Sequence, residues 1–317
     1  MKIFVTSKVP QEVLERLNKY DLIYHDSEKP LSKEEIINKI KDAQVLLCPL
    51  SDKIDKEIID AGKNLKLIAN YGAGYDNIDL NAAKEKGIYV TNAPAPSSAV
   101  STAELTFTLM LALAKNLIPG ERCSRQGGFL GWRPTFFLGH ELRGKTLGII
   151  GMGNIGKNLA KRALAFEMNV IYYSRHRKED IESLNVKYLP SKEEVIKNSD
   201  FLSLHTAFAP ELKHMISKDQ FQMMKKSAYL INAARGPLVD EKALIEALNS
   251  GEIAGAALDV YEFEPKISQE LKDAKNLILC PHLGNATFEA RLEMGHTALD
   301  NIDDLNAGKI PRNNLIK

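Results

Sequence analysis

A glycine-rich segment near the middle of the chain has a spacing suited to phosphate binding. It reads Gly151-Met-Gly153-Asn154-Ile155-Gly156, directly after the apolar run at residues 146–150 and at the start of a helical pattern at 155–166. In that setting the first glycine permits a sharp turn, the second lets backbone approach a pyrophosphate, and the third allows close packing of helix on strand. The phosphates then rest on the helix N-terminus. The motif predicts a dinucleotide site, and a purely structural glycine turn is the alternative.

The end of the next predicted strand bears on which dinucleotide is used. An Asp or Glu about 20 residues beyond the glycines usually binds the adenosine ribose 2′-hydroxyl. This chain instead has Ser174-Arg175-His-Arg177-Lys, with no acid. A cationic loop without a carboxylate can accept a 2′-phosphate, which favours NADP over NAD. The alternative is that these are solvated surface charges and both cofactors are used.

Further along the chain, three polar residues each follow a predicted strand: Arg235, Glu264 and His282. Ligands of open α/β sheets bind at such strand ends. If a bound dinucleotide delivers a hydride to a carbonyl carbon, a proton donor is needed at the carbonyl oxygen, and histidine suits that role near neutral pH. A carboxylate can orient the imidazole and favour its protonated form, and a guanidinium can polarise the carbonyl. Singly, the three could also be a loop ion pair, a loop acid and a strand-end packing residue.

The motifs around these residues resemble those of the D-isomer-specific 2-hydroxyacid dehydrogenases, and within that family most of all the glyoxylate/hydroxypyruvate reductases. The similarity runs over essentially the whole chain. Besides the glycine motif, it rests on Asn70-Tyr-Gly-Ala-Gly74, Asn232-Ala-Ala-Arg235-Gly-Pro, Leu258-Asp259-Val-Tyr-Glu-Phe-Glu264-Pro and Pro281-His282-Leu-Gly. The resemblance implies that Arg235, Glu264 and His282 are catalytic. It also implies NAD(P)H-dependent, reversible reduction of a small 2-oxo acid, with an NADPH-leaning loop favouring reduction.

The same resemblance assigns binding residues. Besides Arg235, the substrate carboxylate is expected at Tyr71, Gly72, Ala73 and Gly74, where two glycines let backbone N–H groups converge on an anion, with a plain turn as the alternative. His205 is interpreted as a structural or cofactor-side residue, and Asp259 could cap a turn instead of touching the cofactor. The predicted cofactor contacts are Thr102, Gly151, Gly153, Asn154, Ile155, Gly156, Ser174, Arg175, Arg177, Ala233 and Asp259.

The alternation of short apolar runs with helical patterns predicts an α/β protein of two doubly wound parallel-sheet domains with a cleft between them. We expect a flavodoxin-like substrate domain at 1–98 plus 287–317 and a Rossmann dinucleotide domain at 99–286. Residues 92–98, with two prolines and two serines, disfavour helix and central strand and mark the boundary. Strands are expected at 3–5, 45–47, 67–69, 88–90, 146–150, 170–173, 201–204, 228–231, 255–258 and 277–279. Helices are expected at 11–19, 33–41, 56–61, 80–86, 105–118, 155–166 and 287–306.

Composition limits the partners. The 42 Lys and Arg against 41 Asp and Glu give a net charge of +1, so no nucleic-acid partner is implied. The apolar run at 105–118 contains Lys115 and Asn116 and is shorter than the roughly 20 residues of a membrane helix, so it is expected to be buried. No signal-peptide-like stretch follows Met1, and a cytoplasmic protein is expected. The three cysteines show no metal-site spacing, and no metal is predicted.

Trp132 is the only tryptophan and lies in a glycine-rich aromatic stretch, residues 126–139. In the resembled family this stretch belongs to a dimerisation arm, so a homodimer is expected. Trp132 is then either an interface anchor or part of the partner's substrate pocket. Two rival functions stay open. One is another D-2-hydroxyacid dehydrogenase of lactate or phosphoglycerate type, and the other is a nucleotide-sensing protein like the corepressors that share this fold.

Overall fold

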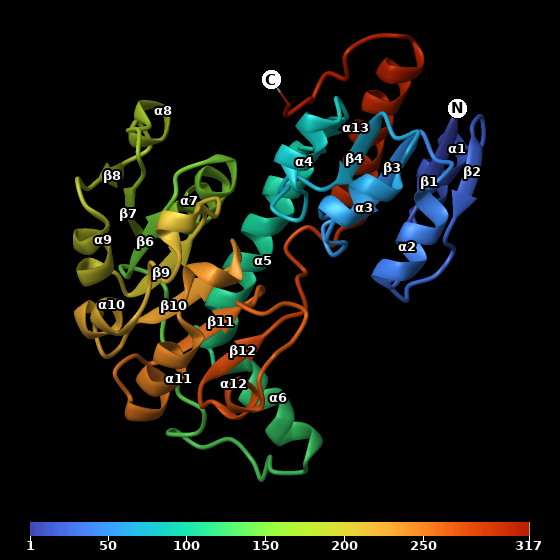
Figure 1. The fold of residues 1–317 in the computed structure, drawn as a ribbon. Coiled ribbons are helices and arrows are strands. Elements are labelled where there is room, and N and C mark those ends of the chain that lie inside the picture. Colours follow the sequence, from blue (N-terminus) through green and yellow to red (C-terminus); the bar gives the residue numbers. More distant parts are fainter. Residues whose placement is uncertain (317) are drawn as a thin grey trace. The chain divides into compact units, whose positions relative to one another are not determined.

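The computed structural model describes residues 1–316, which form two compact units. Unit 1 comprises Met1–Ser98 together with the chain from Thr287 onward, and unit 2 comprises Ala99–Ala286. Figure 1 traces both along the chain. Each unit has its own parallel sheet with helices on both faces, so each is described by itself.

The sheet of unit 1 has five parallel strands in the order β2-β1-β3-β4-β5, the flavodoxin-like order. Its central strands are buried on both faces, which explains their continuous apolar sequence. Because all strands run the same way, the loops that follow them emerge at one edge. The strands are β1 Lys2–Val5, β2 Asp21–Tyr24, β3 Val45–Pro49, β4 Leu67–Tyr71 and β5 Tyr89–Thr91.

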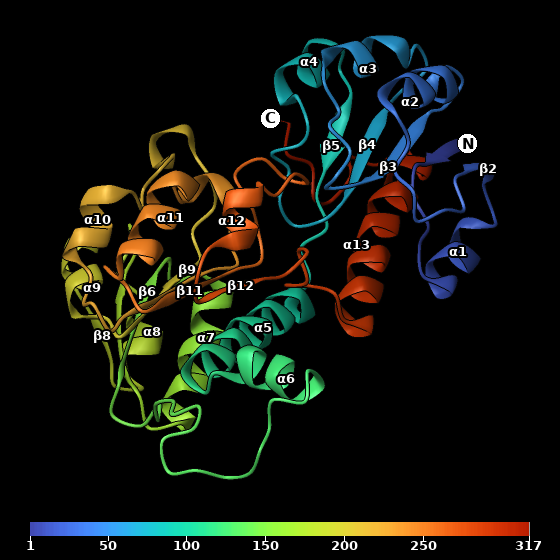
Figure 2. The same cartoon turned by 90° about the horizontal axis from the view of Figure 1, so that it is seen from below.

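Five helices cover this sheet. Helices α2, α3 and α4 pack on one face and α1 and α13 on the other, as Figure 2 shows. Four of them begin at side-chain caps, in which Ser32, Asp55, Asp79 and Thr287 accept a backbone N–H of the first turn. The helices are α1 Gln11–Leu17, α2 Lys33–Ile40, α3 Lys56–Ala61, α4 Leu80–Glu85 and α13 Phe288–Asn306.

The sheet of unit 2 has seven parallel strands in the order β12-β11-β10-β9-β6-β7-β8. Counted from β6, this is the Rossmann order with one further strand, and the order reverses between β6 and β9. Dinucleotides bind at such a reversal. The strands are β6 Thr146–Ile150, β7 Asn169–Tyr173, β8 Val186–Tyr188, β9 Phe201–Leu204, β10 Tyr229–Asn232, β11 Gly255–Leu258 and β12 Leu277–Leu279.

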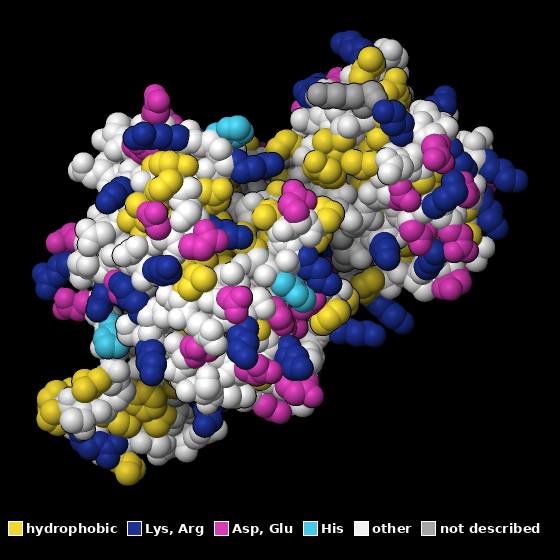
Figure 3. Space-filling view, turned by 60° about the vertical axis from the view of Figure 1, so that its left-hand side comes forward, with side chains coloured by type: hydrophobic (Ala, Val, Ile, Leu, Met, Phe, Trp, Pro, Cys, Tyr) yellow, Lys and Arg dark blue, Asp and Glu magenta, His cyan; other side chains and the backbone are white. Residues whose placement is uncertain are grey.

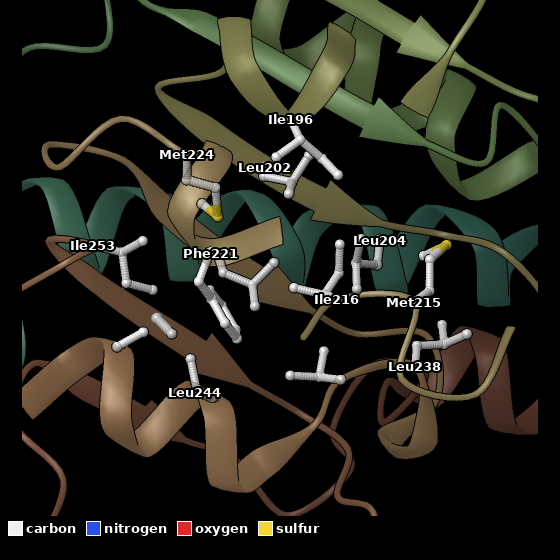
Figure 4. Packing of buried hydrophobic residues seen from close by; sticks show 14 of the residues in the cluster. Ile196, Leu202, Leu204, Met215, Ile216, Phe221, Met224, Leu238, Leu244 and Ile253 are labelled. Atoms are coloured by element: carbon white, nitrogen blue, oxygen red, sulfur yellow. The ribbon is translucent and has the colours of Figure 1, made fainter. Parts of the chain in front are cut away.

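Two apolar cores, one on each face, hold unit 2 together. Helices α5, α7 and α8 pack on one face of the sheet, and α9 to α12 on the other. Figure 4 shows the second core, which includes Phe221, Leu244 and Ile253, and Phe221 is fully buried in it. Replacing such a phenylalanine with alanine costs about 3–5 kcal/mol. The helices are α5 Pro96–Ala114, α6 Leu117–Arg125, α7 Asn154–Ala165, α8 Glu179–Glu182, α9 Lys192–Asn198, α10 Lys218–Met223, α11 Glu241–Ser250 and α12 Gln269–Asp273, with 3-10 turns η1 Pro210–Leu212 and η2 Gly236–Leu238.

The first long helix of unit 2 differs from the sequence prediction at both ends. Helix α5 begins at Pro96, inside the stretch expected to be irregular, because proline is favourable at the first helical position. It ends at Ala114, and the chain turns at Asn116 with φ +51° before α6, so the expected buried helix is present but its bounds, 105–118, are wrong. By length and composition α5 could cross a membrane, but 61% of its apolar window is buried inside the protein. Helix α5 is a core helix, because its apolar side chains belong to the same buried cluster as those of β6.

Candidate active site

The three proposed catalytic residues follow three neighbouring strands. Arg235 comes after β10, Glu264 after β11 and His282 after β12, and these strands are adjacent in the order β12-β11-β10. Because the strands are parallel, all three residues emerge at the same edge of the sheet. The glycine motif follows β6 at that edge as well. Topology therefore collects residues that lie up to 131 positions apart, from Gly151 to His282, on one edge.

His282 and Glu264 form a direct pair, with 2.9 Å between Nδ1 and Oε1. The two side chains are 35% and 38% exposed, so the pair is open to solvent and to a ligand. With Nδ1 held by the carboxylate, Nε2 is the ring nitrogen left for a substrate. His282 has φ +56°, an uncommon conformation for a residue with a side chain, and such conformations concentrate at functional sites.

Arg235 is positioned by the end of its own strand. The amide of Asn232 donates from Nδ2 to the Arg235 carbonyl (2.9 Å) and accepts at Oδ1 from the Ala234 N–H (3.1 Å). Asn232 is fully buried, so these bonds fix the turn that presents Arg235. The guanidinium itself is partly exposed and donates from Nη1 to the Ala234 carbonyl at 2.7 Å. Sequence reasoning did not single out Asn232, although it begins the motif that contains Arg235.

Asp259 holds the loop that carries His282. Its carboxylate accepts the N–H groups of Leu283 (2.6 Å) and Gly284 (2.8 Å), and its carbonyl accepts that of His282 (3.0 Å). The side chain is almost fully buried, and burial raises its pKa. The side chain therefore caps a turn, which was the alternative interpretation of Asp259. A contact between Asp259 and the cofactor stays a prediction.

Two further predicted cofactor residues lie nearby: Thr102 is close to the turn that Asp259 caps, and Ala233 is next to Asn232. Thr102 of α5 is buried, and its Oγ1 would be 3.3 Å from a Cβ added at Gly284. Ser101, its neighbour, donates from Oγ to the Gly284 carbonyl at 2.8 Å. Ala233 is the first residue after β10 and is buried. Both predicted residues thus lie at the same sheet edge as the glycine turn.

The glycine turn leaves room for a pyrophosphate. Gly151 has φ +104°, and a Cβ there would be 2.5 Å from the backbone of His205, so no larger residue fits. A Cβ at Gly156 would be 2.5 Å from the Gly151 carbonyl oxygen, as expected for close helix–strand packing. Gly153, at the N-cap of α7, has open space where its Cβ would be. Asn154 and Ile155 open the helix, whose N-terminus would face the phosphates. The turn therefore fits a dinucleotide.

The loop after β7 is less free than its sequence suggests. Arg177 donates three hydrogen bonds of 2.6–2.9 Å to Glu182, which also accepts from the Tyr172 hydroxyl. Ser174 donates to the His176 carbonyl at 2.5 Å. Arg175 is exposed and forms no ion pair with any of residues 1–316. Of the two predicted arginines, Arg175 is available to a 2′-phosphate and Arg177 would have to leave Glu182.

His205 directly follows β9, beside the glycine turn, and does not resemble an acid–base group. Its Nε2 is 2.8 Å from the Ser203 hydroxyl, and its Nδ1 is buried without a hydrogen-bond partner among residues 1–316. Burial lowers the pKa of His205 to about 3. The imidazole is therefore neutral near pH 7, in agreement with its structural interpretation.

The predicted carboxylate-binding loop belongs to unit 1 and follows β4. The carbonyls of Gly72, Ala73 and Gly74 each accept a hydrogen bond, from the Ala93 N–H (2.8 Å), Asn92 Nδ2 (2.8 Å) and Asn70 Nδ2 (2.6 Å). Within residues 1–316 no acceptor is found for the N–H groups of Gly72, Ala73 and Gly74. A loop with satisfied carbonyls and free N–H groups suits an anion.

Tyr71, by contrast, is committed to the fold of unit 1. Its hydroxyl donates to the Arg291 carbonyl at 2.5 Å, and burial raises its pKa well above the usual range. The Tyr71 hydroxyl is therefore not free for a substrate.

Among residues 1–316 there is no group of three or more His, Cys, Asp or Glu side chains that could hold a metal ion.

Comparison with known proteins identifies the family. The model of the D-isomer specific 2-hydroxyacid dehydrogenase NAD-binding domain matches residues 107–284. A Staphylococcus aureus protein that carries the name of a 2-hydroxyacid dehydrogenase is 48% identical over 292 residues, 92% of each chain. The crystal structure of a Thermus thermophilus protein is similar over all of both chains, with TM-score 0.93 and 38% identity.

Two solved structures of named activity are also similar. A glyoxylate reductase from Paecilomyes thermophila aligns with TM-score 0.85 and 32% identity, over 99% of this chain and 98% of that one. A D-lactate dehydrogenase from Aquifex aeolicus, complexed with NAD and lactic acid, aligns with TM-score 0.86 and 32% identity, over 100% and 99%. With the sheet order, the glycine turn and the His282–Glu264 pair, these findings show that the chain belongs to the D-isomer-specific 2-hydroxyacid dehydrogenases.

Proposed function

We propose that this NAD(P)-dependent D-2-hydroxyacid dehydrogenase reduces glyoxylate or hydroxypyruvate, with His282 as the proton donor. The observation that carries the assignment of roles is the 2.9 Å contact between His282 Nδ1 and Glu264 Oε1. A carboxylate in that position orients the ring and stabilises its protonated form, so that Nε2 can give a proton to the substrate carbonyl oxygen. Bound NAD(P)H supplies the hydride. In the oxidative direction neutral His282 accepts the hydroxyl proton.

Arg235 would hold the substrate. The guanidinium can bind the carboxylate in a fixed geometry and stabilise the negative charge that develops on the carbonyl oxygen. In unit 1, the free N–H groups of Gly72, Ala73 and Gly74 also suit a carboxylate. Leu50 packs against Gly72, and its Cγ would be 2.6 Å from an added Cβ, so no larger residue fits there.

NADPH preference is part of the proposal. Ser174 stands where an acid would bind the ribose 2′-hydroxyl, and Arg175 beside it is exposed. The ion pair of Arg177 with Glu182 limits the preference, because only one of the two arginines is free without rearrangement. We therefore expect NADPH to be favoured while NADH is still used.

A homodimer is also proposed, formed through residues 117–138. This stretch exposes an unusual run of large apolar side chains, seen as the yellow patch at the bottom of Figure 3. Trp132 and Leu130 are each 82% exposed. Such a patch on a protein surface marks an interaction site. The exposed members are Leu117, Ile118, Phe129, Leu130, Trp132, Phe137 and Leu138.

A kinetic panel tests the substrate and cofactor together. Glyoxylate, hydroxypyruvate, pyruvate and 3-phosphohydroxypyruvate are each reduced with NADH and with NADPH, and kcat/KM is compared. The highest values are expected for glyoxylate or hydroxypyruvate with NADPH, and His282→Ala serves as the inactive control. A tenfold preference for pyruvate would instead assign a lactate-type enzyme. Light scattering at low and high protein concentration tests the dimer. We also propose a cytoplasmic location, which cell fractionation tests.

A further inference from the structure

The loops that carry Arg235 and Glu264 touch each other through their backbones. Gly236 follows Arg235, and a Cβ added to it would be 1.8 Å from the Tyr261 carbonyl oxygen and 2.5 Å from the Glu262 nitrogen. Gly236 is also buried. Glu262 lies two residues before Glu264. A displacement of Glu262 would therefore move both the turn that presents Arg235 and the segment that presents Glu264.

Three side chains outside the proposed catalytic set contact Glu262. The Glu241 carboxylate accepts the Glu262 N–H at 2.7 Å, and Glu241 is buried at the start of α11. The Glu262 carboxylate is 2.7 Å from His214 Nε2 and 3.8 Å from Lys213 Nζ, and it is only 9% exposed. Loss of the His214 ring would leave this enclosed carboxylate with Lys213, 3.8 Å away, as its ion-pair partner, and without its short contact.

His214 is itself anchored to the other loop. Its N–H donates to the Pro237 carbonyl at 2.8 Å, and two residues later Ile216 donates to the Leu238 carbonyl at 3.0 Å. Its φ is +54°, a conformation that histidine rarely adopts and that glycine adopts freely. The backbone of His214 is thus paired with the segment after Arg235, while its ring reaches the segment before Glu264.

We propose that His214 is a positioning residue that, through Glu262, keeps the Arg235 and Glu264 loops in register. We call His214, Glu241 and Glu262 the loop clamp. None of the three needs to touch substrate or cofactor. The inference rests on the proposed function only in assigning catalytic roles to Arg235 and Glu264. Without the ring of His214, the Glu262 side chain loses its nearer partner and keeps only Lys213 at 3.8 Å, so Glu264 is held less firmly against His282.

The variant that tests the clamp is His214→Gly. Glycine keeps the positive φ and the N–H bond to Pro237, so only the ring contacts are lost, at 2.7 Å with Glu262 and at 4.0 Å with Asp240. Asn185→Gly is the matched control, because Asn185 is an exposed residue with φ +64° in the turn before β8. Glu262→Gln is the second clamp variant, since it removes the charge and keeps the shape. Each is measured for melting temperature, cofactor Kd, kcat and KM.

We expect His214→Gly to lower kcat by roughly 10- to 100-fold, because displacements near 1 Å have effects of that size. Its cofactor Kd should stay within about twofold of the wild-type value, as an unaltered glycine turn requires. Asn185→Gly should match the wild type throughout. In a Glu264→Gln background the same His214→Gly change should lower kcat by less, since part of its effect acts through Glu264. The clamp would be overturned if His214→Gly left kcat unchanged. It would also be overturned if this change lowered kcat by the same factor in the wild-type and Glu264→Gln backgrounds.

A separate readout distinguishes failure of the clamp from failure of the proposed function. Hydrogen exchange of the Glu262 amide is measured in the wild type and in His214→Gly, without substrate. Faster exchange in the variant supports the clamp whatever the substrate proves to be. Equal exchange contradicts it. Absence of turnover by the wild type with every 2-oxo acid would refute the proposed function alone.

Discussion

The Gly153→Ala variant tests whether Gly153 is needed to bind the dinucleotide or to maintain the fold. Gly153 has φ −87° and ψ −160°, which alanine can adopt, and nothing lies within 4 Å of the added Cβ. The remaining cost is that of alanine at an N-cap, about 1 kcal/mol or less. For a domain of this size that lowers the melting temperature by about 2–4 °C.

Gly156→Ala provides the contrast. Its Cβ would be 2.5 Å from the Gly151 carbonyl oxygen and 3.3 Å from Ile149 Cγ2. Ordinary contact begins near 3.4 Å, so helix α7 and the turn must separate by about 0.9 Å. Overpacking of this kind costs about 1–3 kcal/mol, which lowers the melting temperature by roughly 2–12 °C. The two variants therefore differ in stability before any cofactor is added.

The assay pairs thermal unfolding of the cofactor-free protein with calorimetric titration of NADPH and NADH. Gly153→Ala should melt close to the wild type yet bind either dinucleotide at least about tenfold more weakly, because its methyl group occupies the space that the pyrophosphate needs. Gly156→Ala should lose melting temperature first. If Gly153→Ala bound both dinucleotides within twofold of the wild type, the pyrophosphate could not lie against Gly153 and the assigned turn would be wrong.

Three further variants address the reaction. His282→Ala should abolish reduction, followed as loss of NADPH absorbance, while cofactor Kd measured by titration stays near that of the wild type. Glu264→Gln should lower kcat for reduction while the cofactor Kd stays near the wild-type value, because the carboxylate 2.9 Å from Nδ1 no longer orients the ring. An unchanged kcat would show that Glu264 does not position His282. Ser174→Asp should raise kcat/KM with NADH relative to kcat/KM with NADPH. If the wild type already preferred NADH tenfold, the proposed binding of the 2′-phosphate by this loop would be wrong.

Strong apolar strands were predicted well from sequence, and weak ones were missed. Strand β6 falls at 146–150, as predicted, because the run is buried and bounded by glycine. Strands β2 and β8 were not predicted. β2 is only half-buried and β8 has three residues, so neither carries a clear apolar signal. Both lie at sheet edges, where one side of the strand has no neighbour and solvent tolerates polar residues.

The proposed catalytic residues could be found from motifs, but what supports them could not. Arg235, Glu264 and His282 stand in recognisable local sequences after strands. His214, Glu241 and Glu262 are ordinary charged residues by sequence, and their contacts join segments 21–48 positions apart. Their burial is a product of the fold and not of local pattern. The Arg177–Glu182 pair was missed for a related reason, since nothing in the sequence says which of several nearby acids an arginine will choose.

The polar residues that support the site share a design. Asn232 at the end of β10 holds the turn of Arg235, and Asp259 after β11 holds the turn of His282 through two N–H groups. Both residues are buried. Asn232 is the last residue of β10 and Asp259 the first after β11, and each of these strands is paired on both sides in the sheet. The sheet fixes the anchor, the anchor fixes the turn, and the turn fixes a side chain that must stay exposed to reach a substrate. Electrostatic stabilisation works only when the groups are held before the reaction begins, which explains why buried amides and carboxylates lie directly behind a solvent-accessible pair.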